Sequence, residues 1–191
     1  VQVQRTIHPS YETTRIIEPK MNDGRIDYCA AVDELFGRGV TPENNAAVPA
    51  LRAFGPQALS PKQPRNGVTD RLGMEALPES GKYFKAFIDT SEPGLTDEID
   101  SQSKWPIVIG PRTRAWIADN ERPLDLLVEG SHRSRFFIPF DAGYHPEMLI
   151  EVYLKHALLL RQSCQALLTR AMIRLDAGDG AGYLKNAMAV H

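Results

Sequence analysis

The densest group of side chains with chemical potential is the run Ser131-His132-Arg133-Ser134-Arg135-Phe136-Phe137. The guanidinium groups of Arg133 and Arg135 are suited to bidentate binding of an anion. A serine beside a histidine would serve nucleophilic catalysis if a carboxylate oriented the imidazole, but no nucleophile-elbow motif surrounds this serine. The run therefore predicts either a polar connector with its aromatic residues in the core, or a surface that binds an anion or a partner.

A second polar group, Asn44 and Asn45, follows Thr-Pro-Glu at 41–43. Threonine, proline and glutamate in this order are typical of a helix start, because they cap the first amides, fit the first turn and complement the helix dipole. The pattern predicts a helix over 41–54, with a kink or an early break caused by Pro49. Capping does not account for the two asparagines, which are poor helix formers. The candidate binding residues are therefore Asn44, Asn45, His132, Arg133 and Arg135.

The cysteines and histidines form no recognisable metal or redox motif. Cys29 and Cys164 are far apart in the chain and lie among apolar residues, which is typical of buried small hydrophobic side chains, although the sequence also permits a disulfide between them. The spacing of His145 and His156 does not require them to converge on an ion. The chain has no P-loop, dinucleotide fingerprint or His-Glu-x-x-His motif. We therefore predict no metal and no cofactor.

Composition and charge narrow the class of partner. The chain has 191 residues, of which 42% are hydrophobic and 24% charged, which is typical of one globular domain. The formal net charge is -2, with both signs interspersed, which argues against a nucleic-acid binder and against a polybasic membrane-surface module. No run reaches the roughly 18 apolar residues of a membrane span. The expected partner is a protein, and the oligomeric state stays open.

The distribution of proline predicts the architecture. All prolines occur at or before Pro146, so the last part of the chain is free to form long helices. A 3.6-residue period predicts a helix over 147–176 and a second helix over 182–191, which together make a helical hairpin. The expected fold is mainly α, with an extended N-terminal arm, several short helices and a long C-terminal helical hairpin.

The shorter elements complete this picture. Apolar residues at helical spacing predict a helix over 27–38, and short helices are expected over 113–120 and 123–129. The acidic segment 92–104 predicts a surface loop. As domains we expect an arm over 1–24 and a single helical domain over 25–191, with a candidate sub-boundary near 146. The helical pattern reaches His191 without a cap, so we expect the natural protein to continue.

Several stretches carry a resemblance to a known family. They are DGRIDY at 23–28, GVTPENNAAV at 39–48 and RAFGP at 52–56, and the segments 9–19, 120–129 and 170–178 fit the same pattern. On these residues the chain resembles a family of large uncharacterised proteins associated with planctomycete bacteria. The resemblance implies an N-terminal membrane helix just upstream and further helices downstream. It assigns no activity, so no catalytic residue is carried over. The chain departs from the pattern at Pro49 and in a shorter acidic segment near 92–104.

The sequence leaves three functional hypotheses. The first is a helical scaffold or partner-binding region of a larger membrane-anchored, extracytoplasmic protein, in which the resemblance supplies the anchor. The second is an enzyme of unrecognised type that uses His132 with a nearby carboxylate, Glu129 or Asp141. The third is a helical-repeat adaptor, which predicts further hairpins after His191.

Overall fold

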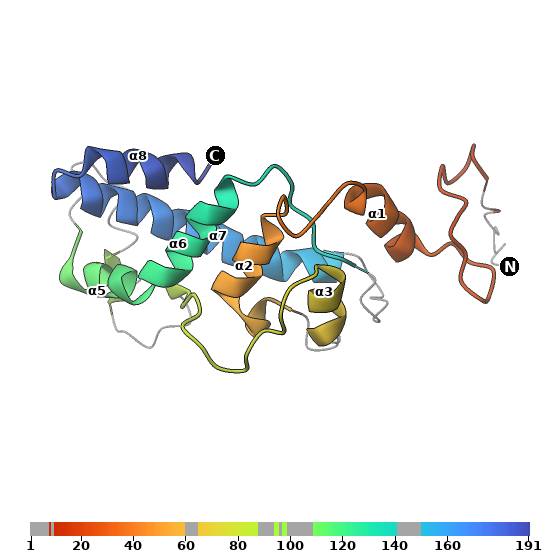
Figure 1. Ribbon diagram of the computed structural model, residues 1–191, viewed down its shortest axis with the longest axis horizontal. Helices are drawn as coiled ribbons and strands as arrows, with labels where there is room; N and C mark the ends of the chain where they lie inside the picture. Colours follow the sequence, from red (N-terminus) through yellow and green to blue (C-terminus); the bar gives the residue numbers. More distant parts are fainter. Residues whose placement is uncertain are drawn as a thin grey trace, which may run out of the picture.

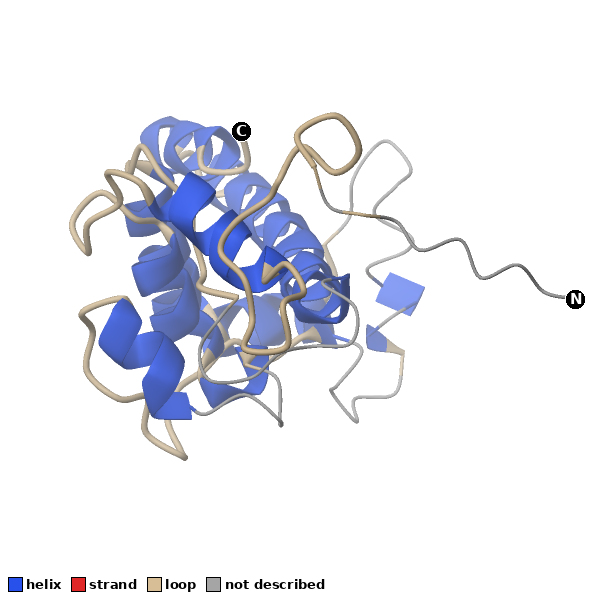
Figure 2. Cartoon of the chain, turned by 90° about the vertical axis from the view of Figure 1, so that its right-hand side faces the viewer, coloured by secondary structure: helices blue, strands red, loops and turns tan. Residues whose placement is uncertain are grey.

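The computed structural model describes residues 8, 10–59, 65–87, 94, 95, 97, 98, 109–140 and 150–191. These ranges hold seven α-helices and one short 3-10 helix, and they contain no strand (Figure 2). The fold is mainly α, as the sequence predicts (Figure 1). The elements are α1 (Tyr28–Gly37), α2 (Ala47–Phe54), η1 (Pro56–Ala58), α3 (Arg65–Arg71), α5 (Pro111–Asp119), α6 (Glu121–Ser131), α7 (Ile150–Asp176) and α8 (Gly180–Met188).

The predicted C-terminal hairpin is formed by α7 and α8, which lie side by side in Figure 1. Asp179 caps α8, because its Oδ1 accepts a hydrogen bond from the backbone N–H of Gly182 at 2.8 Å. Gly178 has a φ of +78°, which lets the chain reverse between the helices. The predicted start of the first helix, at residue 147, lies outside the described residues.

A buried arginine fastens the hairpin to α6. The side chain of Arg170 is 2% exposed. Its Nε donates to Oδ1 of Asn186 on α8 at 2.6 Å, and its Nη1 donates to Oδ1 of Asp125 on α6 at 2.9 Å. A buried guanidinium is tolerated only where such partners surround it. Arg170 therefore fixes the relative positions of three helices.

Helix α2 packs on α6 and forms the centre of the core. The helix start predicted at Thr41 is wrong, because α2 begins at Ala47. Pro49 is the third residue of α2, where its missing N–H has no partner within the helix in any case. The proline is therefore compatible with a straight first turn. Gly130 of α6 lies against Pro49, and a Cβ at that glycine would be 3.1 Å from the proline Cγ.

Helix α1 forms as predicted, and two residues of its apolar stripe are exposed. Asp27 caps it by accepting a hydrogen bond from the N–H of Ala30 at 3.0 Å. Leu35 is 63% exposed and Phe36 60% exposed, whereas Asp33 is buried. Helix α1 lies beside the N-terminal loop at one end of the molecule, at the opposite end from α8 (Figure 1).

Part of the acidic segment also differs from its prediction as a surface loop. Leu95 is buried in the core and, like Glu98, has helical geometry. The carboxylate of Glu98 accepts hydrogen bonds from the backbone N–H and the hydroxyl of Thr113, at 3.0 and 3.1 Å. Glu98 thus supplies an acceptor to the free amides at the start of α5. The rest of 92–104 is not described, apart from residues 94, 95, 97 and 98.

Candidate functional site

Asn45 holds the segment after α6 to the start of α2. Its Oδ1 accepts hydrogen bonds from the N–H of Phe137 at 2.9 Å and of Ala47 at 3.0 Å, and its Nδ2 donates to the Phe137 carbonyl at 2.8 Å. The side chain therefore pairs with both polar groups of one backbone residue and also satisfies the first amide of α2. We call this arrangement the Asn45 clamp.

Asn44 and Arg135 extend the same crossing through their backbones. The N–H of Arg135 donates to the Asn44 carbonyl at 3.0 Å, and the N–H of Ala46 donates to the Arg135 carbonyl at 2.7 Å. The Asn44 amide closes the preceding turn, because its Oδ1 accepts from the N–H of Thr41 at 2.9 Å and its Nδ2 donates to the Gly39 carbonyl at 2.9 Å.

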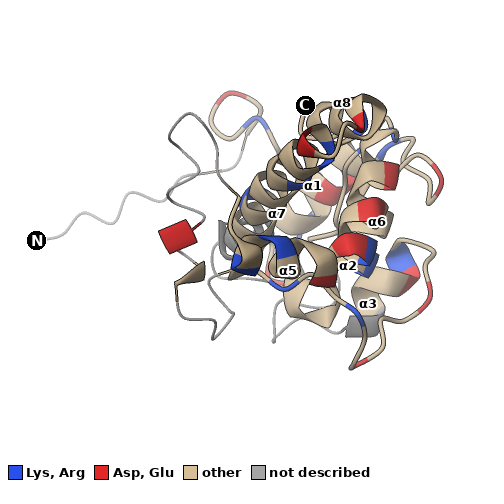
Figure 3. Cartoon of the chain, turned by 90° about the vertical axis from the view of Figure 1, so that its left-hand side faces the viewer, with Lys and Arg blue, Asp and Glu red and all other residues tan. Residues whose placement is uncertain are grey.

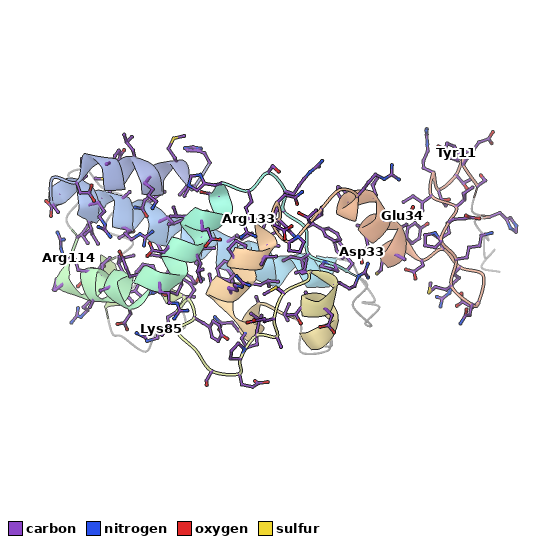
Figure 4. The ribbon with its side chains drawn as sticks, viewed as in Figure 1. Tyr11, Asp33, Glu34, Lys85, Arg114 and Arg133 are labelled. Atoms are coloured by element: carbon purple, nitrogen blue, oxygen red, sulfur yellow. The ribbon has the colours of Figure 1, made fainter. Side chains whose placement is uncertain are left out.

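Arg133 supports this crossing from the α6 side. Its Nη1 donates to the carbonyls of Pro42 at 2.6 Å and Asn45 at 3.1 Å, and its Nη2 donates to Oε1 of Glu129 at 2.9 Å. Figure 4 places the side chain beside α2 and α6. The Arg133 guanidinium thus stabilises the turn that contains Pro42 and Asn45. The pKa of the nearby Glu43 carboxyl is lowered, first by its own backbone N–H, then by the Thr41 hydroxyl and by the charge of Arg133.

The structure thus brings Asn44, Asn45, Arg133 and Arg135 together, and His132 is next to them in the chain with its side chain exposed. Within the described part of the chain the imidazole has no hydrogen-bond partner. The carboxylate of Glu129, which the enzyme hypothesis needed for His132, is paired with Arg133 instead. Asp141, the other carboxylate in that hypothesis, lies outside the described residues.

A cavity of about 420 Å³ lies between the Asn45 clamp and α1. Its lining includes Asn45, Phe137, Asp33, Arg38 and Arg71. The Asp33 carboxylate accepts from the Phe140 N–H at 2.7 Å and forms an ion pair with Nη1 of Arg71 at 3.1 Å. These contacts join α1 to α3 and to the segment after α6. Asp33 thus has a structural role that the sequence analysis missed.

Asn120 makes a second clamp between α5 and α6, which no sequence motif predicts. Its Oδ1 accepts from the N–H of Lys85 at 2.8 Å, and its Nδ2 donates to the carbonyls of Lys85 at 3.2 Å and Trp116 at 3.0 Å. We call this the Asn120 clamp. The one sequence signal was an asparagine between two helical patterns, which is a common residue at a helix boundary.

Histidine and cysteine side chains form no metal site and no disulfide among the residues that the structure describes. No group of three or more His, Cys, Asp or Glu side chains gathers there in a way that could hold a metal ion. His145 and the side chain of His156 lie outside them. No disulfide joins Cys29 to Cys164, and burial raises the pKa of the Cys164 thiol. That shift lowers the reactivity of the thiol at neutral pH.

Comparison with known proteins identifies no relative. A scan against protein-family models, a search of curated proteins and a search of solved structures each gave no match to this chain. No helix in the described residues combines the length and the apolar character that crossing a membrane requires.

Proposed function

We propose that this chain is a helical scaffold that binds a partner protein, and that the apolar face of α1 is its docking surface. The observation that carries the proposal is the exposure of Leu35 and Phe36, at 63% and 60%, on a helix whose other side is tied to the body by Asp33. A contiguous exposed apolar patch marks an interaction site, whereas apolar side chains scattered singly over a surface do not.

The spacing on α1 suits a partner helix. The exposed residues Tyr28, Leu35 and Phe36 stand at i, i+7 and i+8, so they form one stripe along the helix, whereas Val32 at i+4 is partly buried against Cys29 and Phe140. Such a stripe is the usual anchor set when amphipathic helices pack in a groove or against each other. Full burial of one leucine or phenylalanine side chain contributes about 1.5–3 kcal/mol, so two such residues supply a useful part of a binding free energy.

The setting of this scaffold is part of the same proposal. The resemblance at GVTPENNAAV supports a place in a larger extracytoplasmic protein, held by a membrane helix upstream of the first residues. The net charge of -2 supports a protein partner over nucleic acid.

Selection from a displayed library of helical peptides tests the α1 surface. We expect enriched peptides with apolar residues at i, i+3, i+4 and i+7, whose affinity falls at least about tenfold for Leu35→Lys combined with Phe36→Lys. The matched control is Leu184→Lys combined with Met188→Lys on α8, which makes the same change at equally exposed positions. Enrichment of no peptide, or binding that survives the α1 variant, would count against the proposal.

The helical-repeat adaptor is a second candidate, favoured by one observation on α8. Leu184 is 60% exposed and Met188 68% exposed, on the side of α8 opposite the buried Asn186. A neighbouring hairpin would cover such a face, as it does in stacked repeats. Sedimentation at increasing concentration tests whether copies stack. Association that Leu184→Lys with Met188→Lys removes would support the adaptor, and a monomer at every concentration would argue against it.

A further inference from the structure

A groove of about 570 Å³ on a separate part of the surface collects cations from three elements. Arg52 comes from α2, Lys82 from the segment between α3 and α5, and Arg122 from α6. The described lining contains one carboxylate, that of Glu75. The groove therefore has an excess of positive charge, although the whole chain has a formal net charge of -2.

These three cations differ from many others in lacking a partner. Acidic and basic side chains are interspersed over the helices in Figure 3, and pairs such as Lys85 with Asp119 and Arg114 with Asp176 neutralise each other. Arg52, Lys82 and Arg122 form no ion pair and no side-chain hydrogen bond within the described chain. Their charges are thus available to a ligand.

The floor of the groove is apolar and held in place. Leu77 and Leu126 line it beside the ring of Tyr83. The Tyr83 hydroxyl donates to the Pro78 carbonyl at 2.7 Å, and the ring covers Gly55, where an added Cβ would be 2.5 Å from the ring carbon Cγ. The ring is therefore fixed between two backbone segments, and it lines the same groove as the three cations.

We propose that this groove binds an acidic peptide segment, with glutamate or aspartate side chains at the three cations and an apolar side chain on the floor. Each cation is exposed, so a single charge pair would contribute only about 0.2–1 kcal/mol. A ligand with several charges along a flexible chain engages all three at once, which a small anion does not. Recognition of acidic motifs by arginine clusters is a recurrent mode of peptide binding.

Other anionic macromolecules fit the groove less well. A duplex or a bilayer presents a continuous charged surface, and the net charge of -2 repels such a surface outside the groove. The glutamate in the lining also opposes a dense row of phosphates. A peptide with spaced carboxylates avoids both costs, because it contacts the groove alone.

The proposal rests on the proposed function only in taking a protein as the partner. The groove shares no lining residue with the exposed stripe of α1. Loss of the α1 surface would leave the acidic peptide bound, and loss of the groove cations would leave the α1 ligands bound. The two can therefore fail separately.

Fluorescence anisotropy of a labelled peptide with alternating Glu and Leu residues tests the groove, with a Gln-Leu peptide of equal length as control ligand. We expect binding that weakens as salt increases, and no binding of the control peptide. The triple variant Arg52→Gln, Lys82→Gln and Arg122→Gln should weaken binding at least about tenfold. The matched variant Lys20→Gln, Arg161→Gln and Lys185→Gln removes the same charge from exposed positions elsewhere and should leave the affinity unchanged.

Three outcomes would overturn the proposal. One is the absence of binding, and another is an equal loss in both triple variants, which would show that only net charge matters. The third is tighter binding of a labelled oligonucleotide, or displacement of the peptide by an equal concentration of inorganic phosphate. Leu35→Lys with Phe36→Lys serves as the cross-check, because it should not change the affinity for the peptide.

Discussion

The Asn45 clamp and the Asn120 clamp each tie an irregular segment to one end of a helix, but they use the asparagine side chain differently. In each, one buried asparagine pairs with the N–H and the carbonyl of a residue in an irregular segment, Phe137 or Lys85. The third hydrogen bond of each asparagine side chain differs between the two clamps. Asn45 uses its oxygen a second time, for the first amide of α2, whereas Asn120 uses its nitrogen a second time, for the Trp116 carbonyl in the last turns of α5.

The difference follows from which end of a helix each asparagine serves. Helix starts leave N–H groups without partners, and helix ends leave carbonyls that have one backbone donor or none. The Trp116 carbonyl accepts from the backbone N–H of Asn120 at 3.2 Å, and the Asn120 side chain gives it a second donor. An amide side chain carries an acceptor and two donors, so it serves either end in addition to a backbone residue. A carboxylate has acceptors alone. Asparagine-to-aspartate substitution therefore distinguishes the clamps, although it exchanges only one non-hydrogen atom at each.

The largest effect is expected from Asn120→Asp. The carboxylate keeps the bond from the Lys85 N–H but faces the carbonyls of Lys85 and Trp116 without a proton to donate. We expect a loss of about 3–5 kcal/mol in the free energy of unfolding at neutral pH, as for an uncompensated buried charge. Urea denaturation followed by circular dichroism measures this loss.

The pH dependence of stability in Asn120→Asp gives a second test of the donor role of the Asn120 side chain. The two carbonyls raise the pKa of the new carboxyl in the folded state above its unfolded value of about 3.9. The folded state then binds more protons between these two values, so stability relative to the wild type should recover as the pH falls through the folded pKa. A variant as stable as the wild type at neutral pH would refute the donor role of Asn120.

Gly55→Ala should have the next largest effect, and it acts on the segment that Asn120 holds. Gly55 has a φ of +74°, and an added Cβ would be 2.5 Å from Cγ of the Tyr83 ring. We expect a loss of about 3 kcal/mol, from backbone strain together with displacement of the ring. A double-mutant cycle with Tyr83→Ala measures the coupling. Coupling near zero would mean that backbone strain accounts for the whole effect.

Asn45→Asp should cost less than Asn120→Asp. The carboxylate keeps both acceptor roles, to the N–H groups of Phe137 and Ala47, and loses only the donor to the Phe137 carbonyl. Its charge stands at the start of α2, where the helix dipole favours it. We expect a loss of about 1–2 kcal/mol in the same urea assay. An equal loss in the two aspartate variants would contradict the donor and acceptor assignment on which the comparison depends.

The sequence predicts helices well where local signals suffice. Periodicity and the absence of proline identify the α7–α8 hairpin, and Asp27 marks the start of α1. The exposure of the α1 stripe was not predictable, because periodicity shows that a face is apolar and does not show whether the rest of the chain covers it. The predicted start of α2 was wrong, because the Thr41 cap closes a turn instead.

The sequence pointed to some of the buried polar residues that hold the helices together and not to others, because local patterns do not record tertiary contacts. Asn44 and Asn45 stood out because capping left them unexplained, and the structure places them against the Arg133–Arg135 run. Asn120 did not stand out, because an asparagine between two helices is unremarkable. Its bonds reach Lys85, and those of Arg170 reach Asn186 and Asp125, so both depend on tertiary contacts that no local pattern records.

The smallest effect is expected from Gly37→Ala, the counterpart of Gly55→Ala at the Asn45 clamp. An added Cβ would be 3.3 Å from the Phe137 ring, a tight contact, and the backbone there is the last residue of α1. Alanine favours a helix over glycine by about 1 kcal/mol, which offsets the contact. The Phe137 ring also borders the cavity of about 420 Å³, so it has room to shift. We expect a change within about 1 kcal/mol. A loss as large as that of Gly55→Ala would show that the Phe137 ring is as fixed as that of Tyr83, and the two clamps would then differ in their hydrogen bonds alone.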